Sequence, residues 1–126
     1  MKTEFRRVYI DTAPIIYYLE HSAFYMEKMK HFFESCLEHD IQIVTSTITI
    51  EEYLVFPYQS GQMEFADNFK RFLQYMNVEI VNIDDRIAEQ AAKIRGRFKS
   101  FKAMDSLQLA AAIISECDMF SQTINN

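Results

Sequence analysis

Three acidic residues stand where a parallel α/β fold would bring carboxylates together. Asp11 directly follows the β-branched and aromatic run 7–10, Glu52 lies in the first turns of the helix expected after the second strand, and Asp105 opens a long apolar helix. Because the carboxyl ends of parallel strands meet at one edge of a sheet, we expect these carboxylates to converge there. Carboxylates gathered in one cleft repel each other unless a cation lies among them.

Mg²⁺ or Mn²⁺ suits such a cluster, because these hard ions prefer oxygen ligands and keep waters that substrate phosphate oxygens can replace. The sequence therefore predicts phosphodiester hydrolysis by metal-activated water, with Asp11, Glu52 and Asp105 as catalytic and metal-binding residues. No protein nucleophile is needed. The three histidines, at 21, 31 and 39, have no spacing that places them beside the acids, which favours surface or packing roles for them.

Each acid also has a purely structural interpretation. Asp11 would cap the first helix, Glu52 would complete a capping box with Thr49, and Asp105 with Gln108 three residues later is a further capping pattern. Capping and metal binding are compatible, because a helix N-terminus holds an acid firmly. Both interpretations stay open at the level of sequence.

The elements that must position these acids follow from hydrophobic periodicity. Strands are expected at 7–10, 41–45 and 78–83, with a fourth beginning at 119–120, and helices at 14–19, 22–39, 46–58, 62–76, 87–98 and 103–116. Pro57 is expected to end the third helix, Gly61 to break the chain, and Asp84 to cap the fifth helix. The sixth helix is apolar on most faces and should be central. The alternation of strands and helices predicts a mostly parallel sheet covered by helices on both faces.

Length and composition limit the class of protein. A chain of 126 residues, 49% hydrophobic and without Pro- or Gly-rich stretches, is expected to form one domain over 1–126. No apolar run reaches the ~18 residues of a membrane span, and the N-terminus meets an acid before any signal-like region, so we expect a soluble, cytoplasmic protein. Cys36 and Cys117 lack metal-site spacing and are expected to be free, buried thiols.

The charge pattern bears on nucleic-acid binding. A formal net charge of −5 argues against general attraction to nucleic acid. Any nucleic-acid partner must therefore bind through a local group of basic residues or through a bound metal ion. The densest basic stretch lies just before Asp105 and consists of Lys93, Arg95, Arg97, Lys99 and Lys102. It is placed to hold RNA phosphates, although a solvated helix and loop with alternating charges would look the same. Arg6 and Arg7 are a weaker second candidate.

Aromatic residues recur at helical spacing in the second and fourth expected helices: Phe24, Tyr25, Phe32, Phe33, Phe65, Phe69 and Phe72. This spacing favours a core or dimer surface over a platform for stacking bases. If the two helices lie side by side, they form a hydrophobic groove that suits a partner helix or a second protomer.

Three motifs contain the acids in chain order: residues 8–17 (VYIDTAPIIY), 45–52 (TSTITIEE) and 103–112 (AMDSLQLAAA). Together they resemble the PIN-domain family, especially the short VapC-like toxins of prokaryotic toxin–antitoxin pairs. They are similar to that family's opening strand with its acid and Thr, its Ser-x-x-Thr-x-x-Glu helix start and its Asp-led, Ala-rich helix. On this pattern Glu52, not Glu51, matches the second acid, because it lies six residues after Ser46 and three after Thr49.

The resemblance implies a PIN-like three-layer α/β/α sandwich with about four strands and six to seven helices. It further implies a Mg²⁺- or Mn²⁺-dependent endoribonuclease, a homodimer, and a cognate antitoxin whose tail occupies the active-site groove. With an RNA substrate, the expected substrate contacts are Thr12, Arg95, Arg97, Lys99, Lys102 and Thr123.

The sequence departs from the family pattern at its end. The family continues into a Thr-Asn-Asp motif with a fourth acid, whereas this chain reads Ser-Gln-Thr-Ile-Asn-Asn over 121–126, with Asn125 or Asn126 near the expected acid. A truncated chain, an altered reading frame and a natural remnant would each explain this ending. The alternative function is therefore a catalytically degenerate PIN-like module that binds proteins.

Two other enzyme classes fit poorly. A haloacid-dehalogenase-like phosphatase expects a second Asp two residues after the first, where this chain has Ala13. A phospho-accepting receiver domain expects an acidic pair near the first strand and a late strand Lys.

Overall fold

The computed structural model describes residues 6–20 and 23–121, the side chains of 23–25 excepted. The strands are β1 (Arg7–Ile10), β2 (Gln42–Ser46), β3 (Glu79–Val81) and β4 (Met119–Ser121). The helices are α1 (Thr12–Leu19), α2 (Ala23–Glu38), α3 (Thr47–Ser60), α4 (Met63–Tyr75), α5 (Asp85–Arg97) and α6 (Ala103–Ile114). The expectations for His21, Phe24, Tyr25, Thr123 and the chain end concern positions or side chains outside this described part.

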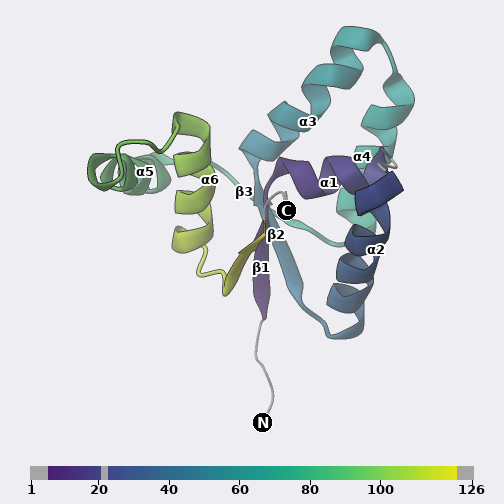
Figure 1. The fold of residues 1–126 in the computed structure, drawn as a ribbon, viewed down its shortest axis with the longest axis horizontal. Coiled ribbons are helices and arrows are strands. Elements are labelled where there is room, and N and C mark those ends of the chain that lie inside the picture. Colours follow the sequence, from purple (N-terminus) through teal and green to yellow (C-terminus); the bar gives the residue numbers. More distant parts are fainter. Residues whose placement is uncertain (1–5, 21–22, 122–126) are drawn as a thin grey trace.

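The strands form one four-stranded sheet in the order β3-β2-β1-β4, and every described pairing is parallel. Val8 of β1 is in register with Ile43 of β2 on one side and with Met119 of β4 on the other. Helices lie on both sides of the sheet, with α5 and α6 on one side and α1, α2 and α4 on the other (Figure 1). The predicted three-layer α/β/α class is confirmed.

Alternate residues of the two central strands build the two faces of the core. Val8, Ile10 and Ile43 pack in the cluster formed with α1 to α4. Tyr9 and Val44 pack in the cluster with α5 and α6. Both sets are almost completely buried, as the period-two geometry of a strand requires when both sheet faces are covered. Buried Phe33, Phe69 and Phe72 confirm the core interpretation of these aromatic positions.

The sixth helix differs in part from its expected central place. Ala110, Ala111 and Ala112 are buried against the sheet and α5, but Ile113 on the same helix is 47% exposed. Small residues let α6 approach the sheet closely, while its outer side faces solvent.

Pro57 does not end the third helix, which continues to Ser60, so this expectation was wrong. The Pro57 ring is buried, and the backbone nitrogens of Gly61 and Gln62 both bond to the Pro57 carbonyl. A proline removes only its own N–H bond and crowds the carbonyl one turn earlier, so packing of the ring can offset its cost. The helix ends instead at Gly61, which has a left-handed φ of 74°.

Replacing Gly61 with Ala is expected to lower the free energy of unfolding by ~1 kcal/mol, because a left-handed backbone is strained for a residue with a Cβ. An added Cβ at Gly61 meets nothing within 4 Å, so the cost is one of backbone conformation alone. Gly96 is the matched control: it lies inside α5, also with open space around it, and Ala there should stabilise by up to ~1 kcal/mol. Urea denaturation of both variants measures the difference, and equal effects would contradict this account.

Other sequence expectations hold with small shifts. The Asp84 side chain accepts a hydrogen bond from the Ile87 backbone nitrogen at 3.0 Å, which confirms it as the cap of α5. The third strand is shorter than expected, since Val78 instead bonds back to Leu73 at the end of α4. Cys36 and Cys117 are free thiols, the first buried and the second half-buried. No helix in the described residues is long and apolar enough to cross a bilayer.

The expected groove between the second and fourth helices is present as a pocket of about 420 Å³ that α1 also lines. Its lining residues are Tyr18, Leu19, Met26, Lys30, Asn68, Arg71, Phe72 and Tyr75.

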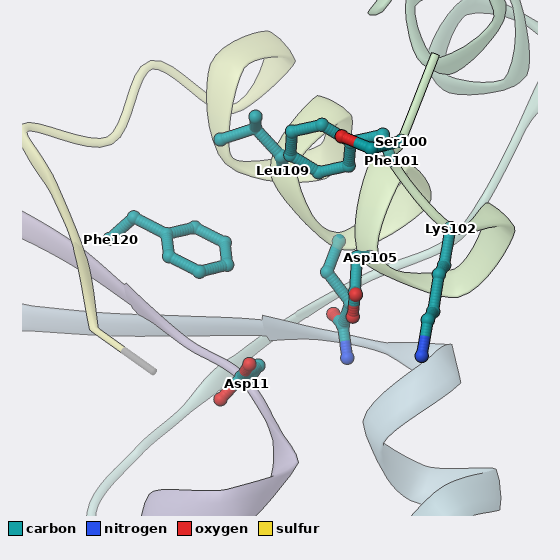
Figure 2. A pocket seen from close by; sticks show the side chains of 8 residues that line it. Asp11, Ser100, Phe101, Lys102, Asp105, Leu109 and Phe120 are labelled. Atoms are coloured by element: carbon teal, nitrogen blue, oxygen red, sulfur yellow. The ribbon is translucent and has the colours of Figure 1, made fainter. Parts of the chain in front are cut away.

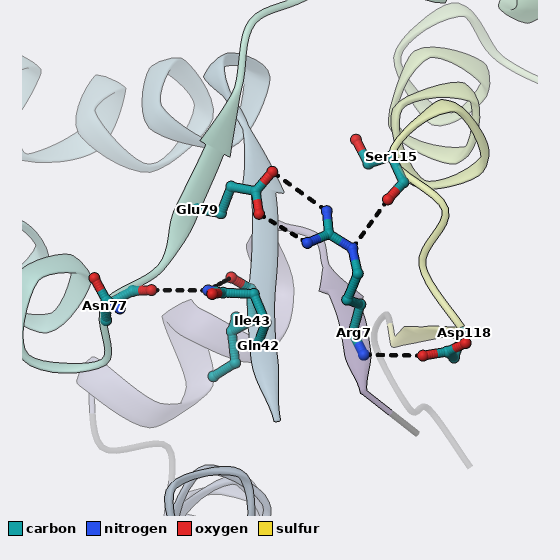
Figure 3. A network of polar contacts seen from close by, with 7 residues as sticks. All are labelled: Arg7, Gln42, Ile43, Asn77, Glu79, Ser115 and Asp118. Atoms are coloured by element: carbon teal, nitrogen blue, oxygen red, sulfur yellow. Dashed lines mark hydrogen bonds and ion pairs between the residues drawn. The ribbon is translucent and has the colours of Figure 1, made fainter. Parts of the chain in front are cut away.

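Arg7 lies at the amino end of the sheet, the edge opposite to Asp11, and its hydrogen bonds join β1 to β3 and to the segment after α6 (Figure 3). Its guanidinium donates to Glu79 of β3 at 2.9 Å and to the Ser115 carbonyl after α6 at 3.0 Å. The Asp118 carboxylate accepts from the backbone nitrogens of Arg6 and Arg7 at 2.8 and 2.9 Å. These contacts favour a structural role for Arg7 over a phosphate contact.

Candidate active site

Asp11 stands between the end of β1 and the start of α1, at the carboxyl edge of the sheet. It occupies the N-cap position of α1, but its side chain makes no capping hydrogen bond. Among the described residues, its buried Oδ1 atom has no hydrogen-bond partner. Capping does not account for this buried oxygen, and a carboxylate oxygen without a hydrogen-bond partner suits a cation ligand.

Burial above all, and then the negative charges of Glu52 and Asp105 in that order, together raise the pKa of Asp11 to about 6. Both acids therefore act electrostatically on Asp11, Glu52 more strongly than Asp105. Bringing a divalent cation into this neighbourhood would reverse the effect, because the cation stabilises the ionised form.

Asp105 lies in the first turn of α6, where Lys102 rather than Asp105 holds the N-cap position. Asp11 and Asp105 line the same pocket, which has a volume of about 370 Å³ (Figure 2). The other lining residues are Ser100, Phe101, Lys102, Gln108, Leu109 and Phe120. In Figure 2 the carboxylates of Asp11 and Asp105 lie at one side of the space, and Lys102 extends beside Asp105.

Glu52 is not among the described residues that line this pocket, and it is oriented by a hydroxyl. Thr12 donates from Oγ1 to Glu52 Oε1 at 2.6 Å. The capping box with Thr49 is not formed, because Ser46 caps α3 by accepting from the Ile48 nitrogen at 3.2 Å. Thr12 was predicted to contact substrate, but the structure gives its hydroxyl a partner within the protein.

A buried hydrogen-bond network of polar side chains lies next to the elements that position these acids. Gln108 of α6 is only 4% exposed, and its Oε1 accepts from the Tyr9 hydroxyl and, at 3.0 Å, from Ser46. Its Nε2 donates to Thr49 Oγ1 at 3.1 Å. The network thus joins β1, the end of β2, α3 and α6; Asp11 directly follows β1, and Glu52 and Asp105 lie on α3 and α6.

The network continues through threonine hydroxyls. Thr45 Oγ1 lies 2.6 Å from the Ile10 carbonyl and 2.9 Å from Thr49 Oγ1, while Thr12 and Thr49 are 3.4 Å apart. A hydroxyl has a single hydrogen, so Thr45 donates to Ile10 and accepts from Thr49, while Thr12 donates to Glu52. The hydrogen bonds from Gln108 then run through Thr49 and Thr45 to the Ile10 carbonyl. Thr12 and Thr49 are left in contact at 3.4 Å without a hydrogen to share, because Thr12 donates to Glu52. This network was not predicted from sequence, where Gln108 entered only as part of a capping pattern.

The basic residues expected to hold RNA separate in the structure. Lys102 lines the acidic pocket, whereas Arg95, Arg97 and Lys99 are exposed at the end of α5 and in the following turn and are not among its described lining residues. Their exposure fits the alternative of a solvated surface, and it also leaves them available to a long substrate.

Within residues 6–20 and 23–121, no group of three acidic, His or Cys side chains is arranged to hold a metal ion directly. Mg²⁺ needs only one or two carboxylates when it keeps several waters. The buried, unpaired oxygen of Asp11 and the neighbouring acids fit that mode of binding.

The geometry defines a parallel α/β/α protein with carboxylates gathered at the carboxyl edge of its sheet. The chain belongs to the PIN domain family, whose model matches residues 8–122. The resemblance stated from the three motifs is thereby confirmed.

Solved structures agree on the fold. A chain of a toxin–antitoxin complex from Klebsiella pneumoniae is similar with a TM-score of 0.66 and 23% identity, over 90% of this chain and 84% of the other. A chain of VapBC2 from Rickettsia felis, solved with a DNA fragment from its promoter, has a TM-score of 0.67 and 14% identity, over 94% and 99% of the two chains. The comparison with curated proteins gave no match.

Proposed function

We propose that this protein, acting as one domain, is a Mg²⁺- or Mn²⁺-dependent endoribonuclease that hydrolyses RNA phosphodiester bonds. The observation that carries the proposal is the buried, unpaired carboxylate oxygen of Asp11 beside Asp105 in an open pocket, within electrostatic reach of Glu52. Membership of the PIN domain family supports the same class of activity.

In this proposal Asp11 and Asp105 hold the metal ion, and Glu52 adds negative charge to the site. The bound ion supplies Lewis-acid polarisation of the phosphate and a lower pKa for water. Thr12 fixes the orientation of Glu52 by donating to it at 2.6 Å. Lys102, on the rim of the same pocket, attracts the substrate phosphate and offsets the repulsion between the phosphate and the acids.

Replacing Glu52 with Gln is expected to lower Mn²⁺-dependent cleavage by on the order of 10²-fold, because the metal site loses one charge while the side-chain shape is kept. The matched control is Glu51→Gln, which removes the same charge from the exposed neighbouring side chain. Both variants are compared with wild type on a structured RNA pool, with EDTA as the metal-free control. Equal loss in the two variants would contradict the assignment of Glu52.

We further propose that the protein is the toxin of a VapBC-type pair in the cytoplasm, as a homodimer that an antitoxin inhibits. The two toxin–antitoxin structures named above support this partner class, and the pocket between α1, α2 and α4 offers a surface for protein association. Light scattering on the purified chain tests the dimer, and a strictly monomeric protein at high concentration would overturn it.

The second candidate function is a catalytically degenerate PIN-like module that binds a protein partner. The observation in its favour is that no three described acidic, His or Cys side chains form a direct metal group. Under this alternative, Glu52→Gln would leave partner binding unchanged, and wild type would show no metal-dependent cleavage.

A further inference from the structure

The strand β4 forms one edge of the sheet. Within the described part of the chain, β1 pairs with its inner side and no strand pairs with its outer side. The Asp118 backbone nitrogen, just before β4, bonds inward to the Arg7 carbonyl at 2.8 Å. Backbone groups of successive strand residues point to alternate sides, so the N–H and C=O of Met119 are directed outward. An open strand edge of this kind is a template for pairing with another chain.

The two edges of the sheet differ in charge. At the other edge, the Glu79 side chain of β3 is charged and 43% exposed, although it also bonds to Arg7. Charge on an edge strand discourages the addition of a further strand. The strand β4 reads Met-Phe-Ser and contains no charged residue. The nearest acid, Asp118, is turned inward, because its carboxylate accepts from the backbone nitrogens of residues 6 and 7.

A hollow of about 220 Å³ lies beside β4, between this strand and α6. Two large apolar side chains that line it are open to solvent, with Ile113 47% exposed and Met119 40% exposed. The full set of lining residues is Leu109, Ala112, Ile113, Cys117, Asp118, Met119 and Phe120. Figure 1 shows β4 beside β1, with α6 just before it in the chain. A strand added to β4 would find both backbone partners and an apolar hollow for a side chain, which is how strand addition achieves recognition.

Charge selects the occupant of this edge. The chain has a formal net charge of −5, so two copies repel each other unless they meet at an uncharged surface. Among the described residues that line the hollow, only Asp118 has a charged side chain, and the chain's own backbone binds it. The groove between α1, α2 and α4 instead carries Lys30 and Arg71, so two such grooves would bring like charges together. The β4 edge therefore suits a second copy better than that groove does.

The edge is also complementary to itself. A two-fold axis beside Met119 would place this residue opposite its own copy in an antiparallel pair, where each N–H donates to the other C=O. The exposed side chains of Met119 and Ile113 in the two copies would then cover one another and remove apolar surface from water. The two sheets would become one continuous sheet across the axis.

We propose that the outer edge of β4 and the adjoining surface of α6 form the contact between two copies of this chain. The proposal rests on the homodimer proposed above and assigns its interface. Because one short strand and one hollow supply the contact, the fraction of dimer should depend on protein concentration.

The test is sedimentation equilibrium of the full-length chain over a range of concentrations. We expect Ile113→Lys and Met119→Lys each to raise the dimer Kd by at least ~10-fold, because each places like charges on both sides of the axis. Met104→Lys is the matched control, since it adds the same charge at a 49% exposed apolar position of α6 that is not among the described lining residues of the hollow. All three variants change the net charge equally, so Met104→Lys should dimerise at least as well as wild type. Circular dichroism confirms that the variants are folded.

Hydrogen exchange of the Met119 amide, followed by NMR, tests the strand pairing itself. Protection of this amide should rise with protein concentration in wild type and be lost in Ile113→Lys. Protection that does not depend on concentration would show that the chain covers its own edge, and it would overturn the proposal.

The remaining outcomes separate the interface from the other proposals. A wild-type dimer that Ile113→Lys and Met119→Lys leave intact, or that Met104→Lys weakens equally, overturns this interface and leaves the homodimer standing. A strictly monomeric wild type overturns both the interface and the homodimer. RNA cleavage by the same preparation reports on the nuclease function independently of either result.

Discussion

The Asp11→Asn variant should be more stable than the wild type in metal-free buffer at pH 8, and it should lose RNA cleavage by on the order of 10³-fold. Both effects come from the same buried carboxylate. Its pKa in the folded protein is about 6, above the ~3.9 of an Asp in an unfolded chain. The folded state therefore binds the proton more tightly than the unfolded state does.

The sign of the pH dependence follows directly. Ionised Asp11 destabilises the folded state, so stability falls as pH rises through the window from ~4 to about 6 and stays reduced above it. The full shift corresponds to ~3 kcal/mol, and partial solvent exposure of the side chain reduces the expected gain for Asn to ~1–2 kcal/mol. Urea denaturation at pH 5 and pH 8 measures it, and the gain should be smaller at pH 5.

Asp118→Asn is the matched control. The Asp118 carboxylate accepts from the backbone nitrogens of Arg6 and Arg7, and these hydrogen bonds lower its pKa. Its replacement should therefore reduce stability at neutral pH, the opposite direction, and leave cleavage intact. If Asp11→Asn destabilised the protein at pH 8 or still cleaved RNA, the assignment of Asp11 to a metal site would be wrong.

The second large effect is expected at Gln108. Gln108→Leu keeps most of the side-chain volume but removes the acceptor for Tyr9 and Ser46 and the donor to Thr49. Buried hydroxyls left without partners each cost ~1–3 kcal/mol, so we expect a loss of ~3 kcal/mol, or a Tm lower by ~10 °C in a chain of this size. Thermal unfolding of the variant measures this.

Cleavage separates the structural and positioning roles of the network. Thr49 Oγ1, which accepts from Gln108, packs 3.4 Å from Thr12 Oγ1, so displacement of Thr49 should shift the hydroxyl that orients Glu52. We therefore expect cleavage to fall by about 10-fold at temperatures where the variant is folded. Gln74→Leu is the control, since this exposed glutamine of α4 is in another part of the fold. A Gln108→Leu protein as stable as Gln74→Leu would show that the network contributes nothing.

Much of the fold is readable from local patterns. The run at 7–10 is a strand with the expected bounds, and Asp84 caps α5 through its own side chain, since both depend on residues close in sequence. The predicted end of α3 at Pro57 is wrong because the Pro57 ring is buried by residues distant in sequence, and local patterns do not show this packing. The three candidate acids are predicted from their places after strands and at helix starts, because a parallel sheet collects side chains at that edge.

The parts of the site that sequence did not reveal depend on contacts between distant segments. Gln108 lies within an apolar helix, and a single amide there gives no sign of whether it is capped, exposed or bonded to a tyrosine 99 residues away. Phe101 and Phe120 flank α6, and only the folded chain shows that both face the acidic pocket. Glu52 was chosen over Glu51 by family pattern, and the hydrogen bond from Thr12 gives that choice a physical basis.

The central claim is that Asp11 and Asp105 hold a divalent metal ion. Calorimetric titration of Mn²⁺ into wild type, Asp11→Asn, Asp105→Asn and the Asp118→Asn control tests it most directly. We predict saturable binding to wild type and to Asp118→Asn, and loss of that binding in Asp11→Asn and Asp105→Asn. Wild type without saturable binding, or Asp11→Asn and Asp105→Asn binding as tightly as wild type, would contradict the account.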